Sequence, residues 1–257
     1  MKILLIGDIV GNSGVKKVKE VIPEFKEKNN IDFVIANGEN SADGMGITLK
    51  IFEDLKKCGV NVVTMGNHTW GKKEIFNFID DERLVRPANY PAGVPGVGYR
   101  IQECNGKKIG VINLLGRVDL NVLTENPFLK ADAILKQIKD KADIIIVDFH
   151  AEATAEKIAL GYYLDGKVTC VFGTHTHVQT ADETILEKGT GYITDIGMTG
   201  PEKSVIGMEV SASIKRFVTT LPERYKVSDD KNVVLTGCVL EINDETCRME
   251  KINRIKL

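Results

Sequence analysis

The sequence predicts an α/β fold in which a mixed sheet, or two packed sheets, is covered by helices. In the first two thirds of the chain, short β-branched runs alternate with amphipathic helical stretches, a pattern typical of βαβ units and parallel strands. In the last third, strand pairs joined by turn residues predict antiparallel hairpins instead. No repeat or linker interrupts the 257 residues, so one domain is expected over residues 1–257.

The parallel part begins with the apolar run "KILLIG" at residues 2–7, which predicts a buried strand. Helical spacing follows over residues 14–28, where Pro23 is a candidate kink. Three more elements continue the alternation: a strand at 31–37, a helix at 47–59 closed by Gly59, and a strand at 60–66.

The proline-rich stretch 81–98 predicts an irregular excursion over the surface. Residues 99–116 form the pattern of a hairpin that turns at Asn105 and Gly106, where both residues can take positive φ. The alternation then resumes with a helix at 127–141, a strand at 142–150, a helix at 151–164 and a strand at 167–173.

The final third predicts hairpins at residues 183–195 and 233–257, the second turning near Asn243 and Asp244. A helix at 210–221 interrupts them.

Composition narrows the class of protein and of partner. The net charge of −2, with 27% charged and 43% hydrophobic residues, gives no reason to expect duplex nucleic acid or an anionic membrane as a partner. The five cysteines form no CxxC pair, which favours reduced thiols and a cytoplasmic location. The apolar run at the start is too short for a signal peptide, and no run is long enough to span a membrane.

Polar residues gather where the predicted strands end, which is where open α/β sheets bind ligands. All four histidines of the chain occupy such positions. The segments "GDIVGNSG", "NGENSADGMG" and "GNHTWG" follow the first three strands, and "H" and "GTHTH" follow the next two of the parallel part. The candidate site residues are Asp8, Asn37, Glu39, Asn40, Asp43, Asn67, His68, His150, His175 and His177.

Each of these residues also has a structural explanation. Asp8 suits a helix cap, Asn40 suits a loop, and a lone histidine such as His68 is usually a hydrogen-bonded core residue. His175 and His177, two positions apart, would point to the same side if their segment were extended. Burying so many unpaired polar groups at one sheet edge would cost several kcal/mol each. A metal cluster resolves that difficulty.

The type of ligand limits the metals. Oxygen and nitrogen donors without a thiol exclude Fe–S and Zn–Cys chemistry and suit two ions such as Fe, Mn, Zn, Co or Ni. Two such ions roughly 3.5 Å apart can stabilise the attacking and leaving oxygens of a displacement at phosphorus.

The ordered series "GD", "GEN", "GNH", a lone histidine and "GTHTH" resembles the motifs of the calcineurin-like metallophosphoesterase superfamily, roughly DxH, GD, GNH, H and GHxH. These motif sequences are most similar to those of the YmdB-like branch of bacterial metallophosphoesterases, which includes cyclic-nucleotide phosphodiesterases. This resemblance covers essentially the whole chain and implies two packed mixed sheets flanked by helices, the αββα sandwich. Two departures from the wider superfamily are Val10 in place of a histidine ligand and Glu39 in place of a bridging aspartate.

The resemblance also implies roles for individual residues. Asn40 supplies the ligand that is missing at position 10, and Glu39 bridges two metal ions. His68 is the catalytic residue, either a general acid or a group that stabilises the phosphoryl oxygens. The implied ligands are Asp8, Asn40 and His177 for one ion, and Asn67, His150 and His175 for the other.

We therefore expect a metal-dependent phosphodiesterase in which a metal-bound hydroxide attacks phosphorus in line. The resemblance points to a small phosphodiester, the 2′,3′-cyclic nucleotides being favoured, and to two transition metal ions per chain, with iron and manganese favoured. One alternative is a phosphomonoesterase or broad phosphatase that uses the same site. Another is a regulatory protein that binds a nucleotide without turning it over. An amidohydrolase is disfavoured because its HxH pair follows the first barrel strand.

Substrate contacts and assembly are less specified. The lone tryptophan, Trp70, suits either base stacking or packing as a loop anchor. The oligomeric state is left open, with residues 87–95 as a candidate surface for a homo-oligomer. Candidate substrate contacts in or near the site loops are Asn12, Ser13, Ser41, Thr69, Trp70 and Arg117.

Overall fold

The computed structural model describes all residues, 1–257, and contains two mixed sheets packed face to face. The larger sheet has eight strands in the order β2-β12-β13-β1-β3-β4-β5, with β14 also pairing with β13. Its strands are β1 (Lys2–Ile6), β2 (Asp8–Ile9), β3 (Phe33–Asn37), β4 (Val62–Thr64), β5 (Leu84–Val85), β12 (Met198–Pro201), β13 (Val233–Ile242) and β14 (Met249–Lys256).

The second sheet has six strands in the order β10-β11-β9-β8-β7-β6. It contains β6 (Tyr99–Cys104), β7 (Lys107–Leu115), β8 (Ile144–His150), β9 (Cys170–Thr174), β10 (Thr184–Ile185) and β11 (Gly191–Ile193). In both sheets the central strands that precede the site run parallel: β3 lies between β1 and β4, and β8 lies between β7 and β9.

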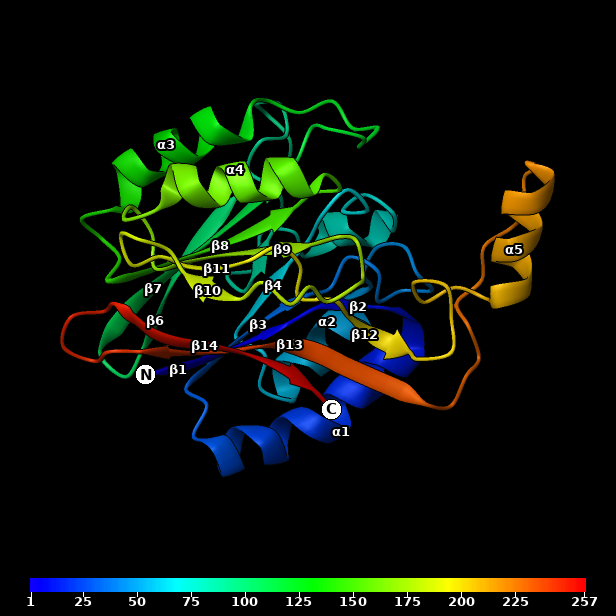
Figure 1. The fold of residues 1–257 in the computed structure, drawn as a ribbon, viewed down its shortest axis with the longest axis horizontal. Coiled ribbons are helices and arrows are strands. Elements are labelled where there is room, and N and C mark those ends of the chain that lie inside the picture. The colour runs from blue at the N-terminus through cyan, green and yellow to red at the C-terminus, as the bar shows by residue number, and fades with distance from the viewer.

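Helices cover the outer faces of the two sheets (Figure 1). Helices α1 (Gly11–Asn29) and α2 (Leu49–Lys57) pack on the larger sheet, whereas α3 (Pro127–Ile138) and α4 (Thr154–Leu164) pack on the smaller one. Local signals define their ends: Thr48 caps α2 by accepting from the Ile51 amide, and Asn126 caps α3 with Pro127 at its first position. The predicted layers of an αββα sandwich are therefore confirmed.

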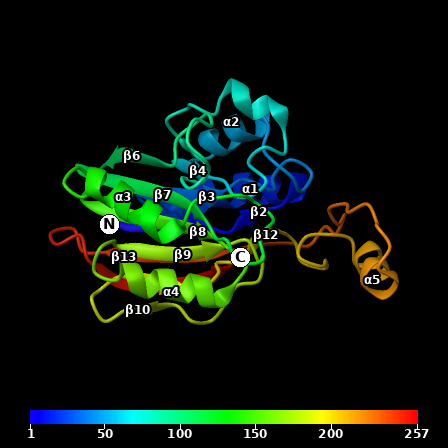
Figure 2. The ribbon, with the colours of Figure 1, turned by 90° about the horizontal axis from the view of Figure 1, so that it is seen from above.

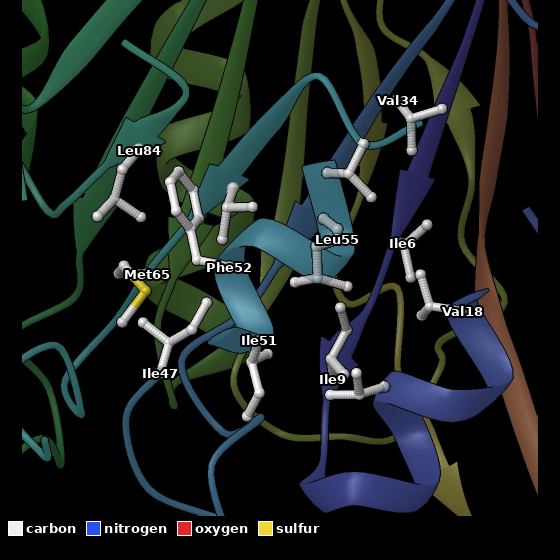
Figure 3. Packing of buried hydrophobic residues seen from close by; sticks show 14 of the residues in the cluster. Ile6, Ile9, Val18, Val34, Ile47, Ile51, Phe52, Leu55, Met65 and Leu84 are labelled. Atoms are coloured by element: carbon white, nitrogen blue, oxygen red, sulfur yellow. The ribbon is translucent and has the colours of Figure 1, made fainter. Parts of the chain in front are cut away.

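The core divides into three apolar layers because both faces of each sheet are buried. Along β1, Ile3 and Leu5 face the second sheet, and Leu4 and Ile6 face α1 and α2. Figure 3 shows this outer layer, in which Phe52 and Leu55 of α2 lie among strand residues of the larger sheet. Alternation of this kind is what a twofold strand repeat produces when both sides of a sheet are covered.

The structure differs from the sequence prediction at several boundaries. Helix α1 begins at Gly11 rather than residue 14 and runs through Pro23. The predicted strand at 60–66 shortens to β4, and the excursion at 81–98 contributes only the two-residue β5. A 3-10 helix, Lys73–Asn77, and the short strands β2 and β12 had no periodic signal, because segments of two to five residues are too short to show one.

Helix α5 (Val210–Thr219) stands apart from the sandwich. Figures 1 and 2 show it projecting from the end of the molecule near β12, well away from both sheets. Only Ser213 of this helix is buried. None of the helices is both long and apolar enough to cross a membrane.

Candidate metal centre

The polar residues predicted from the strand ends meet at one end of the sandwich. Strands β1, β3 and β4 lead into Asp8, Glu39–Asn40 and Asn67–His68 from the larger sheet, and β8 and β9 lead into the remaining histidines from the smaller sheet. Because all five strands run parallel within their sheets, their carboxyl ends share one edge. Four of the assembled residues are almost completely buried: Asp8, Glu39, Asn40 and His150.

One group of side chains surrounds the amide of Asn40. Its Nδ2 atom lies 3.4 Å from Asp8 Oδ1 and 3.1 Å from His177 Nε2. Asp8 Oδ1 and His177 Nε2 are 3.7 Å apart. These three residues therefore present a carboxylate, an amide and an imidazole to one small volume.

A second group surrounds His150. Its Nε2 atom lies 2.9 Å from Asn67 Oδ1 and 3.1 Å from His175 Nδ1. Glu39 lies between the two groups, with Oε1 3.1 Å from His150 Nε2 and 3.3 Å from Asn40 Nδ2. The side-chain donor atoms of Glu39, His150 and His175 all lie within 4.8 Å of one another, close enough to hold one ion.

Outer partners fix which nitrogen of each histidine faces inward. Thr174 Oγ1 donates its proton to Asp148 Oδ1 at 2.7 Å, so at 2.9 Å it accepts from His150 Nδ1. His177 Nδ1 donates to the carbonyl oxygen of Ile206 at 2.8 Å. His175 Nε2 lies 3.0 Å from the Glu152 carboxylate. In the neutral form of each ring the proton therefore lies on the outer nitrogen, and the inner nitrogen is available to a cation or to a second proton, the arrangement of metal-ligating histidines.

The atoms that surround His150 Nε2 show whether the site suits a cation. His150 Nε2 faces a carboxylate oxygen, an amide oxygen and another imidazole nitrogen, all of which are acceptors. Such a set is repulsive unless a proton or a cation lies among its members. The oxygen and nitrogen donors, with no cysteine among them, fit borderline divalent or trivalent metals.

The pKa shifts point to the same need for positive charge. Burial lowers the pKa of His150, but the nearby Glu39 and Asp8 carboxylates outweigh burial and raise that pKa to about 9. Burial and the charge of His150 lower the pKa of His175 to about 3. Burial opposes ionisation of Glu39, yet His150 brings its pKa down to about 2. The cluster thus attracts one positive charge strongly and rejects a second proton on the adjacent ring.

Gly66 is required for this close packing. A Cβ atom at position 66 would lie 2.4 Å from Glu39 Oε2 and 2.5 Å from His150 Nε2. Neither side chain has room to retreat, because both are fully buried. This explains the glycine that precedes Asn67 and His68 in the sequence.

The segment that contains His175 and His177 is not extended. They follow the end of β9 with φ of 99° and 64°, so the backbone turns at both residues. Their side chains consequently diverge: His175 lies against His150, and His177 lies beside Asp8. The turn is held by the His175 amide, which donates to Asp8 Oδ2 at 3.0 Å.

His68 belongs to the cluster but occupies its open side. Its amide donates to Glu39 Oε2 at 2.7 Å, and its Nδ1 lies 2.7 Å from Asn40 Oδ1. The side chain is one-third exposed, and Nε2 makes no hydrogen bond to the protein. Of the two other strand-end residues, buried Asn37 lies 3.3 Å from Asp148 rather than in either group, and Asp43 lies 3.6 Å from Lys72.

Sequence reasoning missed the ion pair beneath the histidine turn. Lys157 Nζ, on α4, lies 2.7 Å from Asp195 Oδ2 and donates to the carbonyl oxygen of Thr174 at 2.8 Å. Asp195 Oδ2 also accepts from the Thr176 amide at 3.1 Å, and both charged side chains are essentially fully buried. Lys157 occupies a helix and Asp195 ends a hairpin, so neither stands in a recognisable motif.

A cavity of about 430 Å³ opens over the cluster. None of the six candidate substrate contacts named from the sequence lines this cavity. Thr69 and Ser41 bond to nearby carbonyl oxygens, and Trp70 stacks on Phe76 with ring centroids 5.5 Å apart. The packing explanation for Trp70 is therefore confirmed.

Comparisons with known proteins bear on this geometry. Residues 4–255 match the family described as YmdB-like protein. The chain belongs to the YmdB-like family. It is 53% identical, over 99% of its own length and 96% of the relative's, to a protein of Bacillus subtilis named 2′,3′-cyclic-nucleotide 2′-phosphodiesterase. This relative, named as a phosphodiesterase, aligns with the chain from end to end, and the chain is accordingly a hydrolase.

Solved structures agree on the fold. A hypothetical protein from Thermus thermophilus matches with a TM-score of 0.94 at 38% identity and covers 100% of this chain and 99% of its own. A structure described as a novel phosphatase from Mycoplasma pneumoniae also matches with a TM-score of 0.94, at 40% identity, over 100% of this chain and 93% of its own. A Staphylococcus aureus structure at 15% identity and a TM-score of 0.63 shares the fold alone.

Proposed function

We propose that the chain hydrolyses 2′,3′-cyclic nucleotides at this site with two transition metal ions as cofactors, iron or manganese being favoured. The observation that carries the proposal is the meeting of two nitrogen–oxygen groups across the buried carboxylate of Glu39. The name of the B. subtilis relative supports the substrate and the bond that is cleaved. In this reaction water adds to phosphorus, the bond from phosphorus to the 2′ oxygen breaks, and a nucleoside 3′-phosphate forms.

The two groups of donors would hold the two ions. Glu39 would bridge them, because its Oε1 lies 3.1 Å from His150 Nε2 and 3.3 Å from Asn40 Nδ2. Bound cations supply Lewis-acid charge to the phosphoryl oxygens and lower the pKa of water. The ligand sets are Asp8, Asn40 and His177 for one ion, and Asn67, His150 and His175 for the other.

Asn40 links the ligands to His68. To act as a ligand, Asn40 must turn its amide oxygen toward Asp8 and His177, where Nδ2 now lies. The same 180° rotation of the amide places Nδ2 where Oδ1 now lies, 2.7 Å from His68 Nδ1. The amide then donates to Nδ1, and the proton of the neutral ring rests on Nε2. With Asn40 as a ligand, His68 would therefore present Nε2–H to the cavity as a hydrogen-bond donor to a substrate oxygen.

His68 is then placed to serve as the general acid. It lines the cavity, and its Nε2 has no competing partner in the protein. A 2′ alkoxide is a poor leaving group, so a proton supplied from Nε2 of the imidazolium form of His68 would lower the barrier, typically by a factor of about 10²–10⁴; the neutral ring would instead stabilise the departing oxygen by a hydrogen bond from Nε2–H. The main-chain bond from His68 to Glu39 holds the ring at this edge of the site.

The test measures the activity of the His68→Asn variant on two substrates that differ in their leaving group. Nitrophenolate departs almost unassisted, whereas a ribose oxygen needs a proton. The variant should keep both metals, lose roughly 10²-fold or more in kcat on a 2′,3′-cyclic nucleotide, and lose visibly less on bis(p-nitrophenyl) phosphate. Equal losses with intact metals would mean that His68 stabilises phosphoryl oxygens, and a fall in metal content would make it a ligand.

The substrate class is tested separately on the unmodified protein. Metal-loaded enzyme should hydrolyse 2′,3′-cyclic AMP faster than it releases phosphate from 2′-AMP or 3′-AMP. Faster turnover of the monoesters would favour a phosphomonoesterase, and binding without product would favour a nucleotide sensor.

A further inference from the structure

The cavity over the candidate metal centre has two kinds of lining. Its floor is made by charged and imidazole side chains of the site, including Glu39 and His68. Its far wall is apolar and comes from a single segment, residues 205–225, which contains α5. The five hydrophobic residues of this wall are Val205, Ile206, Met208, Phe217 and Tyr225.

The start of this segment is hydrogen-bonded to the candidate metal centre. The carbonyl oxygen of Ile206 accepts from His177 Nδ1 at 2.8 Å, so a candidate ligand and the wall share one hydrogen bond. Isolated bridges pair Met208 with Val205 and with Val227, and the Glu209 amide donates to Lys226 at 3.0 Å. The two ends of the segment are thereby joined below α5, and the wall stands at a defined position beside the floor.

The aromatic residues of the wall are exposed to an unusual degree. Phe217 is 75% exposed and Tyr225 is 42% exposed, although both line the cavity. The guanidinium of Arg216 lies 4.8 Å from the centre of the Tyr225 ring, a contact that restrains the ring. Exposed aromatic rings next to a polar site are the usual platform for a base, because stacking on them needs no matched hydrogen bonds.

We propose that Phe217 and Tyr225 form the surface that binds the nucleobase of the substrate. This inference rests on the proposed function, because it places the phosphate over the metal ligands and the base against the wall. A volume of about 430 Å³ lies within the range of roughly 300–1,000 Å³ that is typical of small-molecule sites. Because the wall is apolar apart from Ser213 and the tyrosine hydroxyl, it should accept purines and pyrimidines alike.

The test measures binding, so that it does not depend on turnover. Calorimetry with manganese-loaded protein compares adenosine 3′-monophosphate with the 3-phosphate of methyl riboside, which has no base. Phe217→Ala should weaken binding of the nucleotide by roughly 5- to 100-fold and leave the base-free ligand unchanged. Phe217→Trp should retain the affinity. Val218→Ala is the matched control, since Val218 is the next residue, is 77% exposed and does not line the cavity.

The outcomes separate this proposal from the proposed function. If Phe217→Ala keeps the preference for the nucleotide, or weakens both ligands equally, the base surface is refuted whatever the enzyme hydrolyses. If wild-type protein does not cleave cyclic nucleotides but loses the nucleotide preference on Phe217→Ala, the base surface stands and the proposed reaction falls. An equal loss that accompanies a change of oligomeric state would instead assign the wall to contact with a second copy.

Discussion

Replacement of Lys157 by methionine should expose how much the ligand turn depends on the ion pair beneath it. The ammonium and the Asp195 carboxylate lie 2.7 Å apart, which corresponds to an attraction of about 6 kcal/mol at an effective dielectric constant of 20. Their desolvation offsets part of this attraction in the intact protein. Removal of one partner leaves the other charge buried and unpaired, at a cost of roughly 3–5 kcal/mol. At roughly 2–4 °C per kcal/mol, Tm should fall by about 6–20 °C.

Urea unfolding of metal-free protein measures this loss of unfolding free energy. A second substitution tests whether the unpaired buried charge causes it. Lys157→Met combined with Asp195→Asn should be more stable than Lys157→Met alone, because the uncompensated charge is gone. The surface pair of Lys167 and Asp132, 3.4 Å apart and partly exposed, is the control: Lys167→Met should cost less than about 1 kcal/mol. The reasoning fails if Lys157→Met costs no more than this control, or if the second substitution adds to the loss.

Three further predictions concern the metals. Protein purified without chelator should contain about two transition metal ions per chain by plasma mass spectrometry, and Glu39→Gln should lower that number and nearly abolish activity; one ion or none in active protein would contradict the dinuclear centre. Anomalous scattering should show that His177→Ala empties the position beside Asp8, whereas His175→Ala empties the other; unchanged occupancy in both variants would reject the assignment. Metal binding at pH 7.5 should release a proton from His150, as measured by calorimetry in buffers of different ionisation enthalpy.

The sign of the last prediction follows from the raised pKa of His150. A histidine whose folded-state pKa is about 9 contributes stability that is complete below pH 6.5 and is lost as the pH rises through about 9. A metal ion must displace the proton that provides this stability. Apparent metal affinity should therefore increase with pH and level off near pH 9. An affinity independent of pH from 6 to 9 would show that His150 carries no proton to lose.

Much of the fold was predictable because its central strands are long and apolar. The alternation of "KILLIG", "IDFVIAN" and "ADIIIVDFH" with helices predicted the parallel strands β1, β3 and β8, and Asn105–Gly106 predicted the turn between β6 and β7. The division of strands between the sheets was not predictable from spacing. Strand β13 returns from the end of the chain to lie beside β1, a pairing that depends on tertiary packing alone.

The candidate site was predictable where chemistry coincides with strand ends, and not where it depends on turns. Each candidate ligand follows a parallel strand, so topology alone brings them together. The positive φ of His175 and His177 was not predictable, because the partners of this turn are distant in the sequence: the His175 amide donates to Asp8 and the Thr176 amide donates to Asp195. The wall at residues 205–225 gave no signal either, since its residues resemble those of an ordinary amphipathic helix.

The candidate ligands come from both sheets, and this affects the order in which the protein folds and the site is filled. The His175 amide and Asp8 meet across 167 positions of the chain, and the two belong to opposite sheets of the sandwich. Contacts of such long range carry a large loop-closure cost, so we expect this one to form after the sheets have packed. Ions bound at this site would therefore have little to nucleate: the metal-free chain would fold first, with its buried carboxylates balanced by the proton held on His150. Loading of the proposed metal ions would then be the final step of maturation.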